Sequence, residues 1–373
     1  MKNILSALIL FPGFAIAQQH SFLLKGEIKE WKGKDSVFIH YLTDNKQMAD
    51  STVAIDGRFQ FSGTISQPVL TYISLQKPIK RTEIRDNYRF YLEEGNIVLR
   101  AKDSLRNSTI TSGSVNADYR ELENAIAPAF KRLIAIRMEA MATPVDQRKT
   151  PAFAALEKEY RACIDSMEAV RTRFIKAHPA SFISLEALNL IAGNTMQFQK
   201  TAPLFEKLSP AVKQTPLGKD FASRLETAKK TLTGVVMPSF TSLDTARKEV
   251  HLNDVVQHAK VTLVDFWASW CSPCRAENPN VVKAFNAFHE KGFDIISVSL
   301  DDNASRWKAA IIKDGMPWHH VSGLQKWDEP VAKFFGIQGI PDNFLLDEQG
   351  RVIARGLKGA ELYNKIEELV GKK

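Results

Sequence analysis

Cysteine and long apolar runs are scarce in this sequence. Its 373 residues include 3 cysteines, too few for a small secreted domain held together by several disulfides. No uncharged apolar run reaches the roughly 20 residues that a helix needs to cross a bilayer, so we expect no transmembrane segment in the mature chain. At roughly 100–200 residues per domain, the length predicts two or three soluble domains.

Concentrated charge of one sign is also missing. The net charge is +8, but the surplus of Lys and Arg lies in residues 1–232 and is diluted over several predicted helices. We find neither a dense basic run nor a nucleic-acid-binding motif in the sequence. Such a distribution is typical of a solvated surface, and we expect no nucleic-acid partner.

The first 17 residues have the pattern of a secretory signal peptide. Lys2 precedes an apolar stretch from Ile4 to Phe14, and Ala15-Ile16-Ala17 supplies the small residues of a cleavage site. The alternative is an apolar first helix or strand. We expect cleavage after Ala17 and, because no cysteine lies near the cut, no lipid anchor. The mature protein is therefore predicted to be exported, soluble and periplasmic.

Hydrophobic periodicity divides the mature chain into three predicted parts. Residues 18–114 alternate apolar and polar positions between turn signals such as Asp56-Gly57, which indicates a small β-sandwich or open barrel. Residues 115–232 change to helical spacing, and Cys163 lies in one apolar stripe, where a free Cys is most simply a buried, unreactive hydrophobe. Residues 233–373 alternate strands and helices, which indicates a mostly parallel sheet covered by helices.

Two of the three cysteines are placed for chemistry. Cys271 and Cys274 lie between a predicted buried strand, Val261–Phe266, and a predicted helix, Arg275–His289. Cys271 should therefore stand at the N-terminus of that helix. The unpaired N–H groups and the dipole at a helix N-terminus stabilise an anion, so the pKa of the Cys271 thiol should fall below about 8.5. Because the thiolate is the attacking species in disulfide exchange, we predict Cys271 as the nucleophile and Cys274 as the resolving thiol.

Other uses of a Cys-x-x-Cys pair fit less well. A structural zinc site needs four ligands, and no second pair stands at finger-like spacing. A c-type haem requires His directly after the second cysteine, where Arg275 stands. A static disulfide that closes so short a loop would stabilise little. We therefore expect no metal and no cofactor beyond a redox-active Cys271–Cys274 disulfide.

Several separate segments of residues 236–373 point to one family. They are the stretch Val264–Cys274, VDFWASWCSPC; Pro279, five residues after the second cysteine; and Gly339-Ile340-Pro341 ahead of a predicted strand. Together they resemble the thioredoxin superfamily, specifically the periplasmic TlpA/ResA-like thiol-disulfide oxidoreductases. This resemblance implies an α/β thioredoxin-like fold, a central mixed sheet flanked by helices. The β-rich start more loosely resembles a domain of unknown function that precedes such modules.

The resemblance also implies roles for individual residues. Pro341 would form a cis peptide bond beside the cysteines, and Ile340 would offer its backbone to an extended substrate. Trp270, Ser272 and Pro273 would contribute to the substrate-binding surface around the nucleophile. The simpler alternatives are a trans proline in an ordinary turn and a large aromatic residue at the rim.

Two carboxylates complete the candidate site. Asp265 stands among Val264, Phe266 and Trp267 on the predicted central strand, where burial raises the pKa of a carboxyl. We predict that it accepts the proton of the resolving thiol, through a water molecule. It matches the buried aspartate of thioredoxin, which many TlpA/ResA-like members lack. Glu277 matches the glutamate of the family's C-x-x-C-x-x-E pattern, which tunes the pair. The alternatives are an acid held by hydrogen bonds and an exposed first-turn residue.

These features favour an enzyme that exchanges disulfides with protein thiols, preferably as a reductase. Because the surrounding compartment is oxidising, a reductase would need electrons from a membrane partner. Two alternatives stay open. One is a thiol peroxidase, which uses a lone peroxidatic cysteine rather than a vicinal pair. The other is a binding protein whose thioredoxin module only docks partners.

Overall fold

A computed structural model describes residues 19–43, 46–75, 86–193 and 196–371. The chain divides into two compact units, Met1–Ala187 with Leu208–Gly218 and Leu188–Lys207 with Lys219–Lys373. The expected signal peptide, residues 1–17, lies outside the described residues. Among the described residues, no helix combines the length and the apolar character required to span a bilayer.

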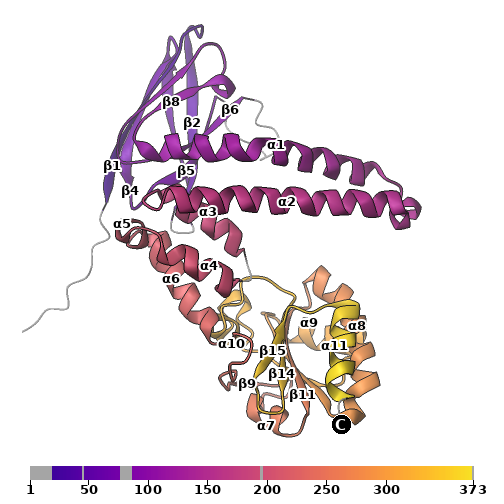
Figure 1. The fold of residues 1–373 in the computed structure, drawn as a ribbon. Helices are drawn as coiled ribbons and strands as arrows, with labels where there is room; N and C mark the ends of the chain where they lie inside the picture. The colour runs from indigo at the N-terminus through magenta and orange to yellow at the C-terminus, as the bar shows by residue number, and fades with distance from the viewer. Residues whose placement is uncertain (1–18, 44–45, 76–85, 194–195, 372–373) are drawn as a thin grey trace, which may run out of the picture. The chain divides into compact units, whose positions relative to one another are not determined.

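The first unit is built on one sheet of eight strands in the order β6-β5-β2-β3-β4-β1-β7-β8 (Figure 1). Strand β1 pairs antiparallel with β4 and parallel with β7, so it joins what would otherwise be two layers. The expected β-sandwich is therefore replaced by a single sheet, nearer to the open-barrel alternative. The strands are β1 His20–Ile28, β2 Lys34–Thr43, β3 Lys46–Ile55, β4 Arg58–Ile65, β5 Val69–Ser74, β6 Asn87–Leu92, β7 Gly95–Ala101 and β8 Thr109–Thr111.

The turn between β3 and β4 shows how local sequence sets this sheet. Asp56 and Gly57 both have positive φ, 47° and 78°, as the central residues of a tight hairpin require. A Cβ atom at Gly57 would lie 2.0 Å from the carbonyl oxygen of Ile28, so only glycine fits. The core of this sheet consists of buried apolar residues at alternate positions along the strands, among them Leu24 of β1 and Leu99 of β7.

Helices occupy the middle of the chain. In the first unit α1 and α2 form a long antiparallel hairpin (Figure 1). Pro151 stands in the first turn of α2, and the Thr150 hydroxyl accepts a hydrogen bond from the N–H of Phe153. Cys163 is buried in α2 as a free thiol. The helices are α1 Ser114–Ala142, α2 Pro151–Ala177, α3 Phe182–Ala192, α4 Phe198–Glu206, α5 Pro210–Lys213 and α6 Pro216–Lys229.

The second unit contains a five-stranded mixed sheet in the order β13-β12-β11-β14-β15. The first three strands in that order are parallel, and β14 and β15 are antiparallel to their neighbours. Strands and helices are β9 Thr241–Leu243, β10 Glu249–His251, α7 Leu252–Gln257, β11 Val261–Trp267, α8 Ser272–Phe288, β12 Phe293–Ser299, α9 Ala304–Asp314, β13 His319–Val321, α10 Pro330–Phe334, β14 Asp342–Asp347, β15 Val352–Arg355 and α11 Gly359–Val370. The mixed sheet with flanking helices that the resemblance implied is confirmed.

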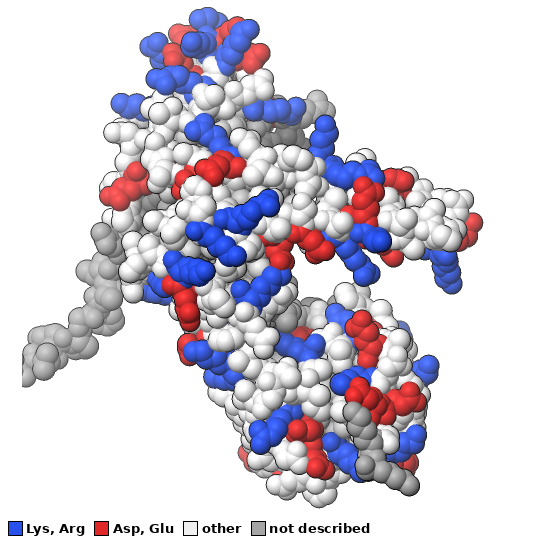
Figure 2. Space-filling model, viewed as in Figure 1, with Lys and Arg blue, Asp and Glu red and all other residues white. Residues whose placement is uncertain are grey.

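The register of this sheet brings distant segments together. Strand β11 is buried at every position and ends just before the cysteines. On β14, Asn343 lies opposite Asp265 and Asp342 lies opposite Phe266. Pro341 directly precedes β14, so the pairing carries the proline loop to the end of β11 where the cysteine loop begins. On the visible face of each unit, Lys and Arg are interspersed with Asp and Glu (Figure 2).

Candidate active site

Cys271 occupies the N-cap position of α8. Its Sγ accepts a hydrogen bond of 3.2 Å from the backbone N–H of Cys274, and the two residues form a disulfide with a Cα–Cα distance of 5.2 Å. Cys271 is 5% exposed and Cys274 is 1% exposed. The same N–H group and the positive end of α8 would face a Cys271 thiolate after reduction, which favours the anion at this sulfur.

The proline loop lies against this nucleophile. The carbonyl oxygen of Ile340 is 3.8 Å from the Sγ of Cys271, and the Ile340-Pro341 peptide bond is cis. Both residues are partly exposed. The backbone of Ile340 is thus the nearest part of this loop to Cys271 for which a contact is found.

Two exposed tryptophans, Trp270 and Trp327, form an aromatic surface at the cysteine loop. Trp270 is 44% exposed, and its indole N–H donates a 3.3 Å hydrogen bond to the carbonyl of Leu300. Its ring centroid lies 6.2 Å from that of Trp327, which sequence reasoning had not singled out. Ser272 and Pro273 are exposed in the first turn of α8. All three predicted substrate-binding residues of this loop are thus accessible.

Asp265 is a buried acid on β11, the strand that precedes the cysteine loop. Burial above all, with the negative charges of Asp342 and Glu277, raises its pKa to about 7, against a hydrogen bond from Ser297 that lowers it. The Ser297 hydroxyl donates to the carboxylate at 3.0 Å and in turn accepts a bond of 2.9 Å from the Trp318 indole. A carboxyl with a pKa near neutrality can both accept and return a proton under physiological conditions.

An ion pair beside Asp265 escaped sequence reasoning. Asp342 and Arg355 lie 2.7 Å apart, with side chains 6% and 17% exposed. Asp342 directly follows Pro341, and an acid at that position is visible in the sequence. Its partner is not, because the contact depends on the antiparallel pairing of β14 with β15. The pair keeps a second charged carboxylate close to Asp265.

Glu277 is half-buried and fastens α8 to α11. One carboxylate oxygen accepts a 2.6 Å hydrogen bond from the N–H of Gly359, the first residue of α11, and the other accepts one of 2.9 Å from the Asn280 side chain. Its charge still acts on Asp265 and raises the pKa of that acid. Glu277 therefore combines a structural contact with an electrostatic effect on the site.

Asp301 and Arg275, neither of them predicted as site residues, hold the segment before the nucleophile. The buried Asp301 carboxylate accepts hydrogen bonds from the Ser269 N–H at 2.9 Å, the Ser269 hydroxyl at 2.5 Å and the Ser299 hydroxyl at 2.7 Å. Arg275 donates to the Ser269 carbonyl at 3.1 Å and forms an ion pair with Asp314. The cysteine loop is thus anchored immediately ahead of Cys271.

Two segments of the chain match known protein families. Residues 232–368 match the Redoxin family model, and residues 22–119 match a domain of unknown function, DUF4369. The thiol:disulfide interchange protein HelX of Rhodobacter capsulatus is 30% identical over 103 residues, 27% of this chain and 53% of HelX. The thiol-disulfide oxidoreductase ResA of Bacillus thuringiensis subsp. konkukian is 28% identical over 139 residues, 37% of this chain and 77% of ResA.

A solved structure is also similar. The thioredoxin domain of a thiol-disulfide oxidoreductase from Bacteroides vulgatus is 40% identical, with 37% of this chain and 98% of that chain covered and a TM-score of 0.35. The chain spans about half the length of HelX, 53%. From the family models and the sequence relatives together, the C-terminal part of this chain is a Redoxin-type, thioredoxin-like thiol-disulfide oxidoreductase domain related to ResA and DsbE, and it follows a DUF4369 domain.

Proposed function

We propose that the protein is an exported thiol-disulfide oxidoreductase that reduces disulfides in client proteins. The observation that carries the proposal is the position of Cys271, which caps α8, is bonded to Cys274 and lies 3.8 Å from the Ile340 carbonyl. A sulfur held at a helix N-terminus and bordered by a polypeptide-accessible backbone suits attack on a protein disulfide.

The reaction proceeds in two exchanges. The Cys271 thiolate attacks a client disulfide, so that a bond forms between Cys271 and one client sulfur while the client S–S bond breaks. The other client sulfur leaves as a thiolate and takes a proton from water. Cys274 then attacks Cys271, which forms the intramolecular disulfide and releases the second client thiolate. Two electrons pass from the enzyme dithiol to the client.

Asp265 supports the second exchange. Cys274 is 1% exposed, so its thiol cannot readily lose its proton to bulk water. Asp265 has a pKa of about 7 because of its burial, and its ionised form can take that proton through a water molecule. The proton returns to solvent after the disulfide closes. Asp265 acts here as the general base for the resolving thiol.

The setting of the reaction follows from the N-terminal sequence. Residues 1–17 carry the signal-peptide pattern, and we propose that the mature protein works in the periplasm. Each turnover leaves Cys271 and Cys274 oxidised, and disulfides persist in such a compartment. We therefore propose a membrane electron donor that returns them to the dithiol.

Insulin reduction driven by dithiothreitol tests this function. The full chain should accelerate the reaction, Cys271→Ser should abolish the acceleration, and Cys274→Ser should accumulate mixed disulfides. Cys163→Ser is the matched control, since that buried thiol lies in the first unit, and should retain full activity. Retention of activity by both active-site variants would refute the assignment. A chain with no rate above background would instead be a binding module, and one that consumes peroxide a peroxidase.

The direction of exchange is tested separately. Titration of the Cys271–Cys274 pair in dithiothreitol or glutathione buffers, followed by tryptophan fluorescence, gives its midpoint potential. A value near roughly −270 mV supports the proposed reductase, whereas one near roughly −120 mV would mean an oxidant of client thiols. Trp267 and Trp270 flank the loop and provide the signal.

A further inference from the structure

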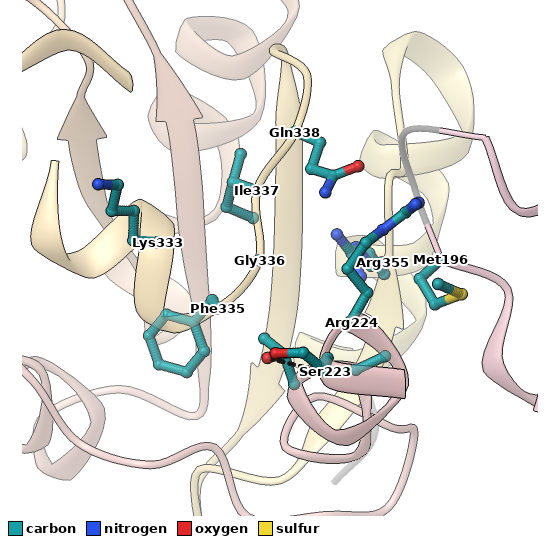
Figure 3. A pocket seen from close by; sticks show the side chains of 11 residues that line it. Met196, Ser223, Arg224, Lys333, Phe335, Gly336, Ile337, Gln338 and Arg355 are labelled. Carbon is teal, nitrogen blue, oxygen red and sulfur yellow. Dashed lines mark hydrogen bonds between the residues drawn. The ribbon is translucent and has the colours of Figure 1, made fainter. Parts of the chain in front are cut away.

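A cavity of about 250 Å³ lies within the second unit (Figure 3). Helix α6, helix α10, strand β15 and the segment 336–338 contribute to its lining. Three lining residues are cations, Arg224, Lys333 and Arg355, and Phe335 and Ile337 contribute apolar surface. The mechanism described above makes no use of this cavity.

The cations of the lining have their acidic partners outside it, namely Asp220, Asp328 and Asp342. None of the eleven lining residues, all of them within the described part of the chain, is acidic. Arg224 and Arg355 line the same cavity and overlap in the view of Figure 3, whereas the ammonium group of Lys333 points away from them. Lys333 pairs with Asp328, outside the lining, at 2.5 Å. The two arginines are therefore the groups that face a ligand.

Arg224 is the less compensated of the two arginines. Its side chain is 16% exposed, and the paired acid Asp220 is 3.9 Å away. Its closer partners are neutral, the Asn189 side-chain oxygen at 2.6 Å and the Gly193 carbonyl at 3.0 Å. A guanidinium has five N–H donors, so further donors remain for a planar anion. Arg355 binds Asp342 through Nε and Nη2, which leaves Nη1.

The cavity is close to the path of a client polypeptide. Gln338 lines it and stands two residues before Ile340, whose carbonyl lies 3.8 Å from the Cys271 sulfur. Two residues of chain span at most about 7 Å. In an extended segment alternate side chains project to the same side. A client strand that ran beside Ile340 would therefore place one of its side chains, a few residues from its reacting cysteine, near Gln338 at the cavity.

We propose that the cavity, here named the Arg224 pocket, binds the carboxylate of an Asp or Glu side chain in the client polypeptide. The carboxylate would accept paired hydrogen bonds from Arg224, with Arg355 beside it, since a guanidinium and a carboxylate match in geometry. The enzyme would thereby prefer clients with an acidic residue two to four positions from the reacting cysteine. This inference rests on the proposed function and names the substrate class of that site.

A series of matched disulfide peptides tests the pocket. Each pair differs only in Glu or Gln at one position, two, three or four residues before or after the reacting cysteine, and kcat/KM is measured for the full chain with dithiothreitol. At one of these positions the Glu peptide should react about tenfold faster, the scale of one charge-assisted hydrogen bond. Arg224→Gln should remove this preference, so that the Glu and Gln peptides react with equal kcat/KM.

Two further variants keep the test decisive. Arg306→Gln removes the same charge from an exposed residue of α9 and should leave the preference intact. Gln338→Glu places a negative charge at the pocket and should reverse the preference. It carries the test if thermal unfolding shows that Arg224→Gln does not fold.

The outcomes separate this inference from the proposed function. Equal rates for Glu and Gln peptides at every position would overturn the pocket while leaving the reductase intact. An equal loss of preference in Arg306→Gln would also overturn it, because long-range charge would then explain the effect. An unchanged preference in Gln338→Glu would have the same meaning. Failure of the wild-type chain to reduce any peptide would instead refute the proposed function.

Discussion

Replacement of Asp265 by Asn should make the protein more stable at neutral and alkaline pH. Burial raises the pKa of Asp265 from an ordinary value of 3.8 to about 7. The stability that this acid contributes in its protonated form is complete below about pH 4 and is lost as the pH rises to about 7. Three units of pKa correspond to about 4 kcal/mol, and Asn avoids that loss while still accepting the Ser297 hydrogen bond.

The pH dependence of the difference between the two proteins is the measurement. Urea unfolding of oxidised wild type and Asp265→Asn at pH 4, 5.5, 7 and 8.5 compares their free energies of unfolding, and the other titrating groups cancel. The difference should be near zero at the lowest pH, grow through the interval and level off above about pH 7. A difference that stays constant across this range would show that Asp265 does not carry a raised pKa, and the argument for its role as a base would fall with it.

Three other perturbations have clear expected results. With Cys274→Ser, non-reducing electrophoresis should show client proteins attached to the nucleophile, and their absence would contradict the order of the two exchanges. Asp342→Asn removes a charge that raises the pKa of Asp265, so the pH profile of turnover should move to lower pH; a shift to higher pH would be inconsistent with that repulsion. Asp301→Asn loses acceptors for Ser269 and Ser299 at a cost of about 1–3 kcal/mol per unsatisfied group. Calorimetry should show a lower unfolding midpoint. An unchanged midpoint would mean that the hydrogen bonds of Asp301 to Ser269 and Ser299 contribute nothing to stability.

The cysteine loop was predictable because its structure is local. A buried run that ends at Trp267, followed by a helix with Pro273 in its first turn, determines where Cys271 stands on the helix. The predicted strand Val261–Phe266 differs from β11 by one residue at its end. The predicted helix Arg275–His289 began three residues too late, since α8 is Ser272–Phe288 and already contains Pro273 and Cys274. The direction of the pKa shift of Asp265 was also predictable. A carboxyl within a continuous apolar strand is buried with that strand, and burial disfavours its charged form.

The contacts that hold the site could not be predicted in the same way. Glu277 binds Gly359, 82 residues away, and Asp301 binds Ser269, 32 residues away. Such partners depend on strand order and on the packing of helices, neither of which the hydrophobic periodicity of the sequence predicts. The same limitation explains the N-terminal sheet. The alternation of apolar and polar residues predicted where its strands lie. It did not predict that β1 pairs with both β4 and β7, and this double pairing makes one sheet instead of two.

The boundary of the second unit has a consequence for how selectivity could be inherited. The Redoxin match begins at residue 232, whereas the compact unit also takes in Leu188–Lys207 and Lys219–Lys229. A gene fragment trimmed to the match would preserve the two sulfurs, the buried acid Asp265 and the proline loop, but would discard the wall that carries Arg224. Under the role proposed for the Arg224 pocket, the redox centre and one wall of the client-selecting site are thus encoded in different stretches of the gene, while Lys333, Gln338 and Arg355 of the same pocket lie inside the match.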